Sequence, residues 1–198
     1  ASALMQGLAD GYFIIPYTIG NYLASQNPFD DNNHDNFKSS IENINNQINQ
    51  MLSINGQRTV DDIHKELGKV MWDHVGMSRS KESLLKALDI IPKIRDEFHN
   101  NINIPGINNE FNPELEKAGR LGDFIDLGEL MAQDALSREE SCGGHFREEH
   151  QTDENEAMRN DESYAYVAAW EYKKNKEHQL HKESLEFENV KLVTRSYK

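Results

Sequence analysis

Cysteine is almost absent from this chain of 198 residues, which has only Cys142. One thiol cannot form an intrachain disulfide, so no disulfide framework holds the fold together. Such cysteine usage is typical of a reducing compartment, and we expect a cytosolic one. Because an isolated cysteine is more often inert than reactive, Cys142 is not expected to act as a nucleophile.

Basic residues and long apolar runs are also scarce. Lysine and arginine total 21 against 34 acidic residues, which gives a formal net charge of -13. Nucleic acids and anionic membranes both attract clustered basic faces, so this balance argues against binding to either. The most apolar stretch, GYFIIPYTIGNYLA at 11–24, is shorter than the roughly 20 residues that span a bilayer. We therefore expect no direct membrane insertion.

The sequence also lacks the short motifs that build a cofactor or metal site by themselves. It contains no Gly-x-Gly-x-x-Gly, no phosphate loop, no His-Glu-x-x-His and no Cys-x-x-Cys. Two histidine pairs, His145 with His150 and His178 with His181, have a spacing that could chelate a metal. Neither pair has a third ligand at a suitable spacing, so we predict surface histidines and no metal site.

The first 24 residues mix small with large apolar side chains, and Asp10 is their only charged residue. A helix that is apolar on nearly all sides normally packs against protein on every side, and the rest of the chain supplies few obvious partners. Two interpretations stay open. The segment belongs to a fragment whose missing N-terminal part covers it, or it is a simple N-terminal core helix.

Four later segments have the three- and four-residue apolar spacing of amphipathic helices. Their apolar positions are Phe37, Ile41, Ile44, Ile48 and Met51; Ile63, Leu67, Val70 and His74; Leu84, Leu88, Ile91, Ile94 and Phe98; and Leu115, Ala118, Leu121, Ile125, Met131 and Leu136. Thr59 and Asn112 are expected to cap the second and fourth helices. The first three helices, within 36–101, predict an antiparallel bundle. The positions expected to face inward are Ile41, Ile44, Ile48, Ile63, Leu67, Leu88, Ile91 and Ile94.

The C-terminal segment differs in composition. YAYVAAWEY at 164–172 and SLEFENVKLV at 184–193 are rich in aromatic and β-branched residues, and the polar stretch 173–183 separates them. They are expected to be two strands. The predicted fold class is therefore mainly α with a small β element (α+β): an antiparallel three-helix bundle, a further long helix and a C-terminal two-stranded region.

Polar groups are densest in SREESCGGHFREEH at 137–150. The simplest interpretation is a solvated helix end followed by a loop. The functional alternative is that Gly143 and Gly144 end the long helix, so that Arg138, His145 and Arg147 donate hydrogen bonds to another domain. In that case we expect these donors to be exposed and the loop to be mobile in this chain by itself.

The stretch RLGDFIDLGELMAQDALSREESCGGHFREEH resembles the C-terminal region of the flavoprotein subunit of succinate dehydrogenase and fumarate reductase. The matching positions are Arg138, Glu140, Ser141, Gly143, His145, Arg147 and Glu148. Cys142 and Gly144 stand where the family commonly has arginine and alanine. The resemblance implies that Arg138, Ser141, His145 and Arg147 form an interdomain structural loop. It also implies that the catalytic residues lie outside this chain.

The beginning, ASALMQGLADGYF, is similar to the last helix of the family's flavin-binding domain, with Ala3 and Leu4 at the positions that contact the flavin. The resemblance thus implies three parts. Residues 1–24 are the last helix of an otherwise missing FAD-binding domain, 36–137 a helical domain and 138–198 a C-terminal domain with the polar loop and two strands. FAD is expected in the full-length protein but not on this chain alone.

For the whole protein, the resemblance implies interconversion of succinate and fumarate at FAD. Electrons would pass first to an iron-sulfur subunit, then through a membrane-anchor cytochrome b subunit to quinone. The expected location is cytoplasmic, peripheral on the inner face of the cell membrane through those partner subunits. Two alternatives stay open: a stand-alone acidic helical interaction module without catalysis, and the related L-aspartate oxidase.

Overall fold

The structure is a computed structural model of the chain, and it describes residues 2–27, 35–107, 110–173 and 178–193. Helices dominate and the strands are short, which confirms the predicted α+β fold class. The chain divides into two compact units, Ala1–Asn46 and Gln47–Lys198. Each is described by itself below.

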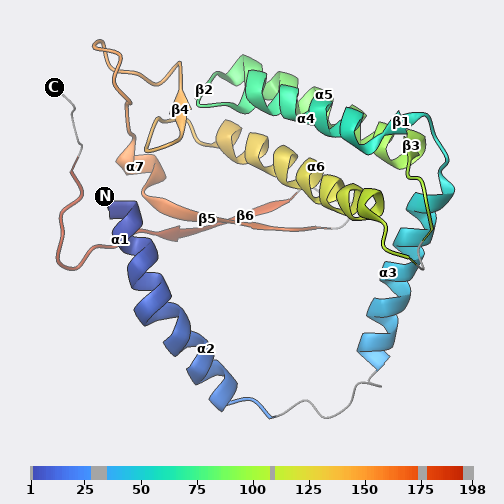
Figure 1. The fold of residues 1–198 in the computed structure, drawn as a ribbon. Coiled ribbons are helices and arrows are strands. Elements are labelled where there is room, and N and C mark those ends of the chain that lie inside the picture. Colours follow the sequence, from blue (N-terminus) through green and yellow to red (C-terminus); the bar gives the residue numbers. More distant parts are fainter. Residues whose placement is uncertain (1, 28–34, 108–109, 174–177, 194–198) are drawn as a thin grey trace. The chain divides into compact units, whose positions relative to one another are not determined.

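The N-terminal unit is helical and has no core. Helix α1 (Ser2–Ala9), a π-helical turn (Asp10–Ile14) and α2 (Ile15–Ala24) follow one another without a break (Figure 1). The π turn lies just before Pro16, which has no N–H to give to an α-helical carbonyl. Every described side chain of this unit is exposed except that of Asp10, which is half-buried. No helix among the described residues is long and apolar enough to cross a membrane.

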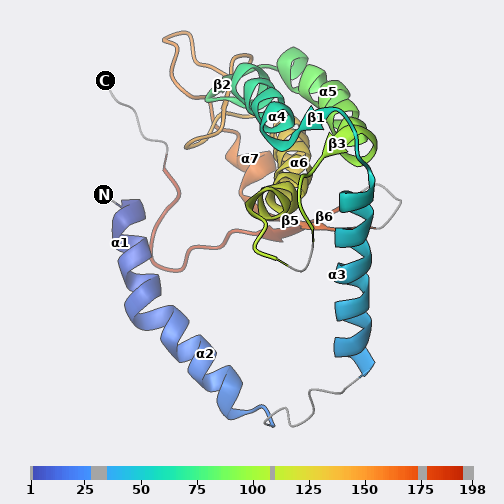
Figure 2. The same cartoon turned by 45° about the vertical axis from the view of Figure 1, so that its right-hand side comes forward.

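The second unit is built on three helices. They are α4 (Val60–Val75), α5 (Lys81–Asn101) and α6 (Pro113–Ser137), and α5 packs against both others (Figures 1 and 2). The core consists of Val60, Ile63, Leu67, Val70, Val75, Leu84, Ala87, Ile91, Ile94, Phe98, Ile102, Ile104, Ala118, Leu121, Ile125, Ala132 and Ala135. Burial of these apolar side chains is the main force that stabilises the unit.

The ends of these helices follow the expected capping chemistry. Thr59 Oγ1 accepts a hydrogen bond from Asp62 N at 3.1 Å, and Asn112 Oδ1 accepts one from Leu115 N at 3.1 Å. Both caps were predicted and both are confirmed. Ser80 caps α5 and exchanges hydrogen bonds with Ser83. Each cap satisfies a backbone donor that has no partner inside its helix.

One helix of the predicted bundle is wrong. The third helix that packs on α4 and α5 is α6, and not α3 (Asp35–Ser53) as predicted. Ile41 and Ile44 of α3 are 58% and 55% exposed, and Ile48 is only half-buried. Helix α6 can pack closely because its buried face is made largely of alanine and glycine. A side chain added at Gly128 would place its Cβ 3.1 Å from Met71 Sδ of α4. The inward positions predicted in α4 and α5 are buried or partly buried.

Two short parallel strand pairs join the ends of the bundle. Strand β1 (Arg58–Thr59) pairs with β3 (Ile102–Asn103), and β2 (Ser78–Arg79) pairs with β4 (Phe146–Arg147). Since α4 runs from β1 to β2, the two pairs lie at opposite ends of that helix (Figure 1). The second pair brings the polar loop onto the bundle.

The C-terminal segment contains α7 (Asp161–Tyr164) and an antiparallel hairpin of β5 (Tyr166–Glu171) and β6 (Gln179–Ser184). The first predicted strand is confirmed. The second was placed at 184–193, whereas all of β6 except Ser184 lies in the stretch 173–183 that was expected to be a connector. The pairing of Trp170 with Leu180, both half-buried, accounts for the register, because a slip of one strand by one residue would turn its apolar side chain to the face opposite its partner.

Candidate functional site

The polar loop that follows α6 is folded against the connection between α4 and α5. Beside the pairing of β2 with β4, Glu148 N donates to Arg79 O at 2.9 Å and Ser78 Oγ donates to Glu148 Oε1 at 2.8 Å. Glu149 accepts a hydrogen bond from Lys81 N at the start of α5. Hydrogen bonds to residues 70 and 68 positions away in the sequence therefore connect the loop to this part of the fold. The expected mobility of the loop stays a prediction.

The two glycines form a tight turn and do not end the helix. Helix α6 ends at Ser137, and the backbones of Cys142 and His145 exchange hydrogen bonds of 2.8 and 3.0 Å across the glycines. Gly143 has a φ of 59°, which type II′ turns require at the first central position. The expected helix-terminating role is thus corrected, and a side chain completes the end of α6 instead.

That side chain is Arg147, which is 1% exposed. Its Nη1 lies 3.1 Å from Ala135 O and 3.4 Å from both Leu136 O and Arg138 O, at the C-terminus of α6. A cation there is favoured twice, because the last carbonyls of a helix lack partners and its dipole is negative at that end. The expectation that Arg147 is exposed is wrong, since its donors are used within the chain.

Ser141 fixes the strand that carries Arg147. Its side chain is fully buried, and its Oγ accepts from Arg147 N at 2.8 Å and donates to Arg147 O at 3.1 Å. One hydroxyl thereby satisfies both backbone groups of the same buried residue. Ser141 and Arg147, two of the residues predicted for the interdomain loop, are therefore hydrogen-bonded to each other.

Arg138 connects the loop to the hairpin. Its Nη1 donates to Glu140 Oε1 at 2.8 Å and to Tyr164 O at 3.1 Å, and its guanidinium lies 4.9 Å from the centre of the Tyr166 ring. Glu140 is only 3% exposed, and its other oxygen accepts from Asn160 N at 2.9 Å. The carboxylate of Glu140 is thus paired with a cation and satisfied by the backbone, as a buried charge must be.

His145 lies between two arginines and is half-buried. Its Nε2 is 2.9 Å from Arg138 O, and its Nδ1 is 3.0 Å from Arg79 Nη2. A carbonyl can only accept, so Nε2 carries the proton and Nδ1 accepts from Arg79. Burial first, and then the positive charges of Arg79, Arg147 and Arg138, lower the pKa of His145 below its ordinary value of 6.5. The ring is therefore held in its neutral form.

Arg79 was not singled out from the sequence, although it is central here. It lies in β2 between two helices, where neither a motif nor a spacing marks it. Its Nη1 donates to Val75 O at 3.2 Å, but its buried Nε has no hydrogen-bond partner. Burial and the neighbouring Arg147 lower the pKa of Arg79.

A cavity of about 330 Å³ opens beside this cluster. It is lined by Arg79, Met131, Asp134, Ala135, Arg138, Cys142 and His145. Asp134 Oδ1 accepts from Trp170 Nε1 at 2.7 Å, which ties the cavity wall to β5. Donors outnumber acceptors around this space, so it favours a ligand that accepts hydrogen bonds.

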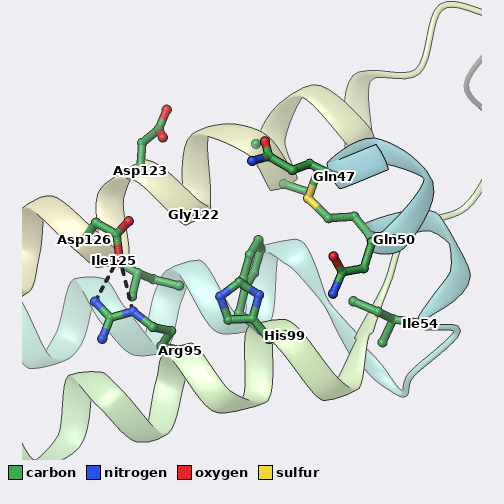
Figure 3. A pocket seen from close by; sticks show the side chains of 13 residues that line it. Gln47, Gln50, Ile54, Arg95, His99, Gly122, Asp123, Ile125 and Asp126 are labelled. Carbon is green, nitrogen blue, oxygen red and sulfur yellow. Dashed lines mark hydrogen bonds and ion pairs between the residues drawn. The ribbon is translucent and has the colours of Figure 1, made fainter. Parts of the chain in front are cut away.

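A second cavity of about 450 Å³ lies among the last turns of α3, the last turns of α5 and the first half of α6 (Figure 3). Gln47 and Gln50 border it from α3, and Arg95 borders it from α5. Arg95 Nη2 lies 3.0 Å from Asp126 Oδ1 and 2.6 Å from Glu129 Oε2, so its charge is already neutralised. Within the described residues, no group of three or more His, Cys, Asp or Glu side chains is placed to hold a metal.

The two residues predicted to contact the flavin lie in the other unit. Ala3 and Leu4 are in the first turn of α1, and both are exposed. Their role stays a prediction. The remaining predicted site residues, Arg138, Ser141, His145 and Arg147, are brought together in one hydrogen-bonded cluster.

Comparison with known proteins assigns the chain to a family. The model of the family described as fumarate reductase flavoprotein C-term matches residues 64–197. The chain belongs to this family. The match includes most of the three-helix core, the polar loop and the hairpin, so the resemblance first seen around residues 120–150 is confirmed.

Individual relatives cover part of the same region. The chain is 31% identical over 118 residues to an FAD-dependent oxidoreductase of Methanocaldococcus jannaschii, which is 59% of this chain and 21% of that protein. It is 28% identical over 113 residues to the succinate dehydrogenase flavoprotein of Rickettsia felis, which is 57% of this chain and 19% of that protein. The matched part is about a fifth of the length of these relatives.

A solved structure has the same fold. The flavoprotein chain of the quinol fumarate reductase of Escherichia coli superposes with a TM-score of 0.69 at 20% identity. The superposition covers 81% of this chain and 27% of that one. At this identity the likeness supports the fold alone, and it agrees with the helical core and the short strands.

Proposed function

We propose that this chain is the C-terminal part of a flavoprotein subunit that interconverts succinate and fumarate. The observation that carries the proposal is the family match over 64–197, which includes the hydrogen-bonded cluster of Arg138, Ser141, His145 and Arg147. The relatives are about five times longer than their matched region, so most of the proposed subunit would lie outside these 198 residues.

FAD is the cofactor we propose for the whole protein, since one relative is named as an FAD-dependent oxidoreductase. When bound, the flavin supplies hydride and electron transfer, while the protein binds and orients it. In this chain, the only residues expected to contact the flavin are Ala3 and Leu4, which would meet its edge. Ala3 and Leu4 are exposed in the first turn of α1, and the small side chain of Ala3 leaves its backbone open to close approach.

In this chain the polar loop has a structural task that can be stated from its contacts. Arg147 completes the end of α6, Ser141 holds the backbone of Arg147, and His145 joins Arg79 to Arg138. A rigid support of this kind orients neighbouring groups better than a free loop. We propose that contact with an upstream flavin domain is made by the exposed tip of the turn, Cys142 to Gly144.

The partners we propose are a membrane-anchor cytochrome b subunit together with an iron-sulfur subunit. Support comes from the similar fold of a chain of a quinol fumarate reductase, an enzyme whose name couples a quinol to fumarate. The acidic net charge of -13 does not favour direct attachment to anionic lipid, so membrane association would pass through the partner subunits. The proposed location is the inner face of the cell membrane.

The test uses the full-length protein that contains this chain. We expect the visible absorption band of oxidised flavin, reduction of an artificial dye by succinate, and oxidation of a reduced viologen dye by fumarate. Activity with aspartate in place of succinate would indicate an L-aspartate oxidase. A colourless full-length protein would instead support the stand-alone interaction module. The 198-residue chain by itself is the control, and we expect it to bind no flavin and to show no activity.

A further inference from the structure

The cavity of about 330 Å³ beside the polar loop has a lining rich in hydrogen-bond donors. Two arginines and a histidine line it, and Met131, Ala135 and Cys142 supply apolar or weakly polar surface. All of these residues belong to the second unit. Cavities of this volume are at the lower end of those that hold small molecules in proteins.

Arg79 has more donors than the protein uses. A guanidinium carries five N–H groups, and the described contacts of Arg79 are with Val75 O and His145 Nδ1, both of them neutral acceptors. Its Nε–H is buried without an acceptor. Within the described parts of the chain, no carboxylate forms an ion pair with Arg79. An unpaired donor of this kind is an energetic cost that an added acceptor would remove.

The other charges on the wall are already bound. Arg138 is paired with Glu140 at 2.8 Å, and Asp134 accepts from Trp170 Nε1. Backbone carbonyls fix both arginines: Val75 O of α4 accepts from Arg79, and Tyr164 O of α7 and Tyr166 O of β5 accept from Arg138. The two side chains therefore need little rearrangement to receive an anion. The carboxylate of Asp134 disfavours a ligand with a high negative charge, because like charges repel each other.

From this arrangement we infer that the cavity binds a short carboxylate. Its carboxylate group accepts hydrogen bonds from the guanidinium groups of Arg79 and Arg138, and its aliphatic part lies against Met131 and Ala135. Planar guanidinium donors match the two oxygens of a carboxylate, which explains the preference for this group. The inference does not rest on the proposed function, since every residue involved lies in this chain and outside the flavin edge at Ala3 and Leu4.

Cys142 makes the inference measurable, because it is the only cysteine of the chain, is exposed and lines the cavity. Iodoacetate and iodoacetamide alkylate a thiol with loss of iodide and differ mainly in the carboxylate that iodoacetate carries. Relative to a free cysteine derivative, we expect Cys142 to favour iodoacetate over iodoacetamide by about tenfold, because a cationic recess concentrates the anion. The rates are followed by mass spectrometry of the intact chain.

Variants and competitors complete the experiment. Arg79→Gln should bring the reagent preference back to that of the free thiol. Arg120→Gln removes the same charge from an exposed position on α6, several turns from the cavity, and should leave the preference unchanged. In the wild-type chain, acetate or succinate should slow alkylation by both reagents beyond the effect of chloride at equal ionic strength. Acetate and succinate are tested separately, and the stronger competitor shows whether the cavity prefers a monocarboxylate or a dicarboxylate.

Two results would overturn the inference. One is an absent preference for iodoacetate in the wild-type chain together with no protection by acetate or succinate. The other is protection by inorganic phosphate alone, which would show a site for a different anion. The competition arm needs no variant, so a misfolded Arg79→Gln protein would not prevent a decision. Circular dichroism of each variant shows whether it is folded.

Discussion

The two units of the chain differ in what happens to their apolar side chains. Residues 2–24 are more uniformly apolar than any other segment, yet all of their described side chains but Asp10 are exposed. The helices α4, α5 and α6 carry many charged residues, and they bury a core of alanine, valine, leucine, isoleucine and phenylalanine. An apolar segment therefore does not make a core by itself.

The physical reason is that burial requires a partner surface. Helix α4 has α5 and α6 beside it, and its Leu67 is 3% exposed. Helix α3 has a similar apolar spacing, but its Ile44 is 55% exposed. Amphipathic spacing predicts that a helix forms and which of its faces is apolar. It does not predict what covers that face.

The strongest test of this comparison is a pair of core substitutions. Leu67→Ala should lower the free energy of unfolding by about 2–5 kcal/mol, since it removes buried methyl groups and leaves a cavity. Ile44→Ala should change it by less than about 0.5 kcal/mol, because an exposed side chain gains little on folding. Both values come from urea denaturation followed by circular dichroism. Equal losses would mean that the face of α3 is covered in solution, and the comparison would fail.

A second test asks whether the polar loop belongs to the stable unit. Arg147→Met keeps much of the side-chain volume but removes the donors to the last carbonyls of α6 and to Glu149. We expect a loss of about 1–3 kcal/mol, the cost of leaving buried groups without partners. Arg120→Met is the matched control on the same helix, because its ion pair with Glu116 is exposed and such pairs contribute about 0–1 kcal/mol. If the two variants lost the same stability, the cap formed by Arg147 would contribute nothing specific.

The turn at the tip of the loop gives a smaller effect. Gly143→Ala should cost about 1–2 kcal/mol, since residues with a β-carbon are strained at a φ of 59°. Gly144→Ala should be nearly neutral, because its φ is not in the positive region and open space surrounds its α-carbon. The comparison of their urea midpoints needs no other control. A neutral Gly143→Ala would show that the turn can change its geometry at no cost.

The smallest expected effect is a dependence on pH. Since the pKa of His145 is lowered in the folded chain, the unfolded chain takes up the proton first as the pH falls below about 6.5. Stability should therefore decrease from about pH 7.5 to about pH 5.5, a window above the range in which carboxylates titrate. His145→Gln should reduce this decrease, whereas His64→Gln, at an exposed position of α4, should leave it unchanged. An unchanged slope in His145→Gln would contradict the assignment.

Much of the local structure could be predicted from the sequence. The caps at Thr59 and Asn112, the apolar faces of α4 and α5 and the strand at 166–171 all depend on neighbours within a few residues. Such interactions are encoded by spacing and by the chemistry of single side chains. The candidate loop was also visible in the sequence, because its polar residues and glycines are concentrated in fourteen positions.

The sequence alone determined which segments form helices, where the main helices begin, and which loop concentrates polar chemistry. Only the tertiary structure decided that α6 completes the core in place of α3, that β6 pairs through Leu180, and that Arg147 is buried. It also brought Arg79 to His145 across 66 positions of the chain. These outcomes depend on packing between distant segments, where close approach, burial and unpaired donors decide among alternatives that have the same local pattern.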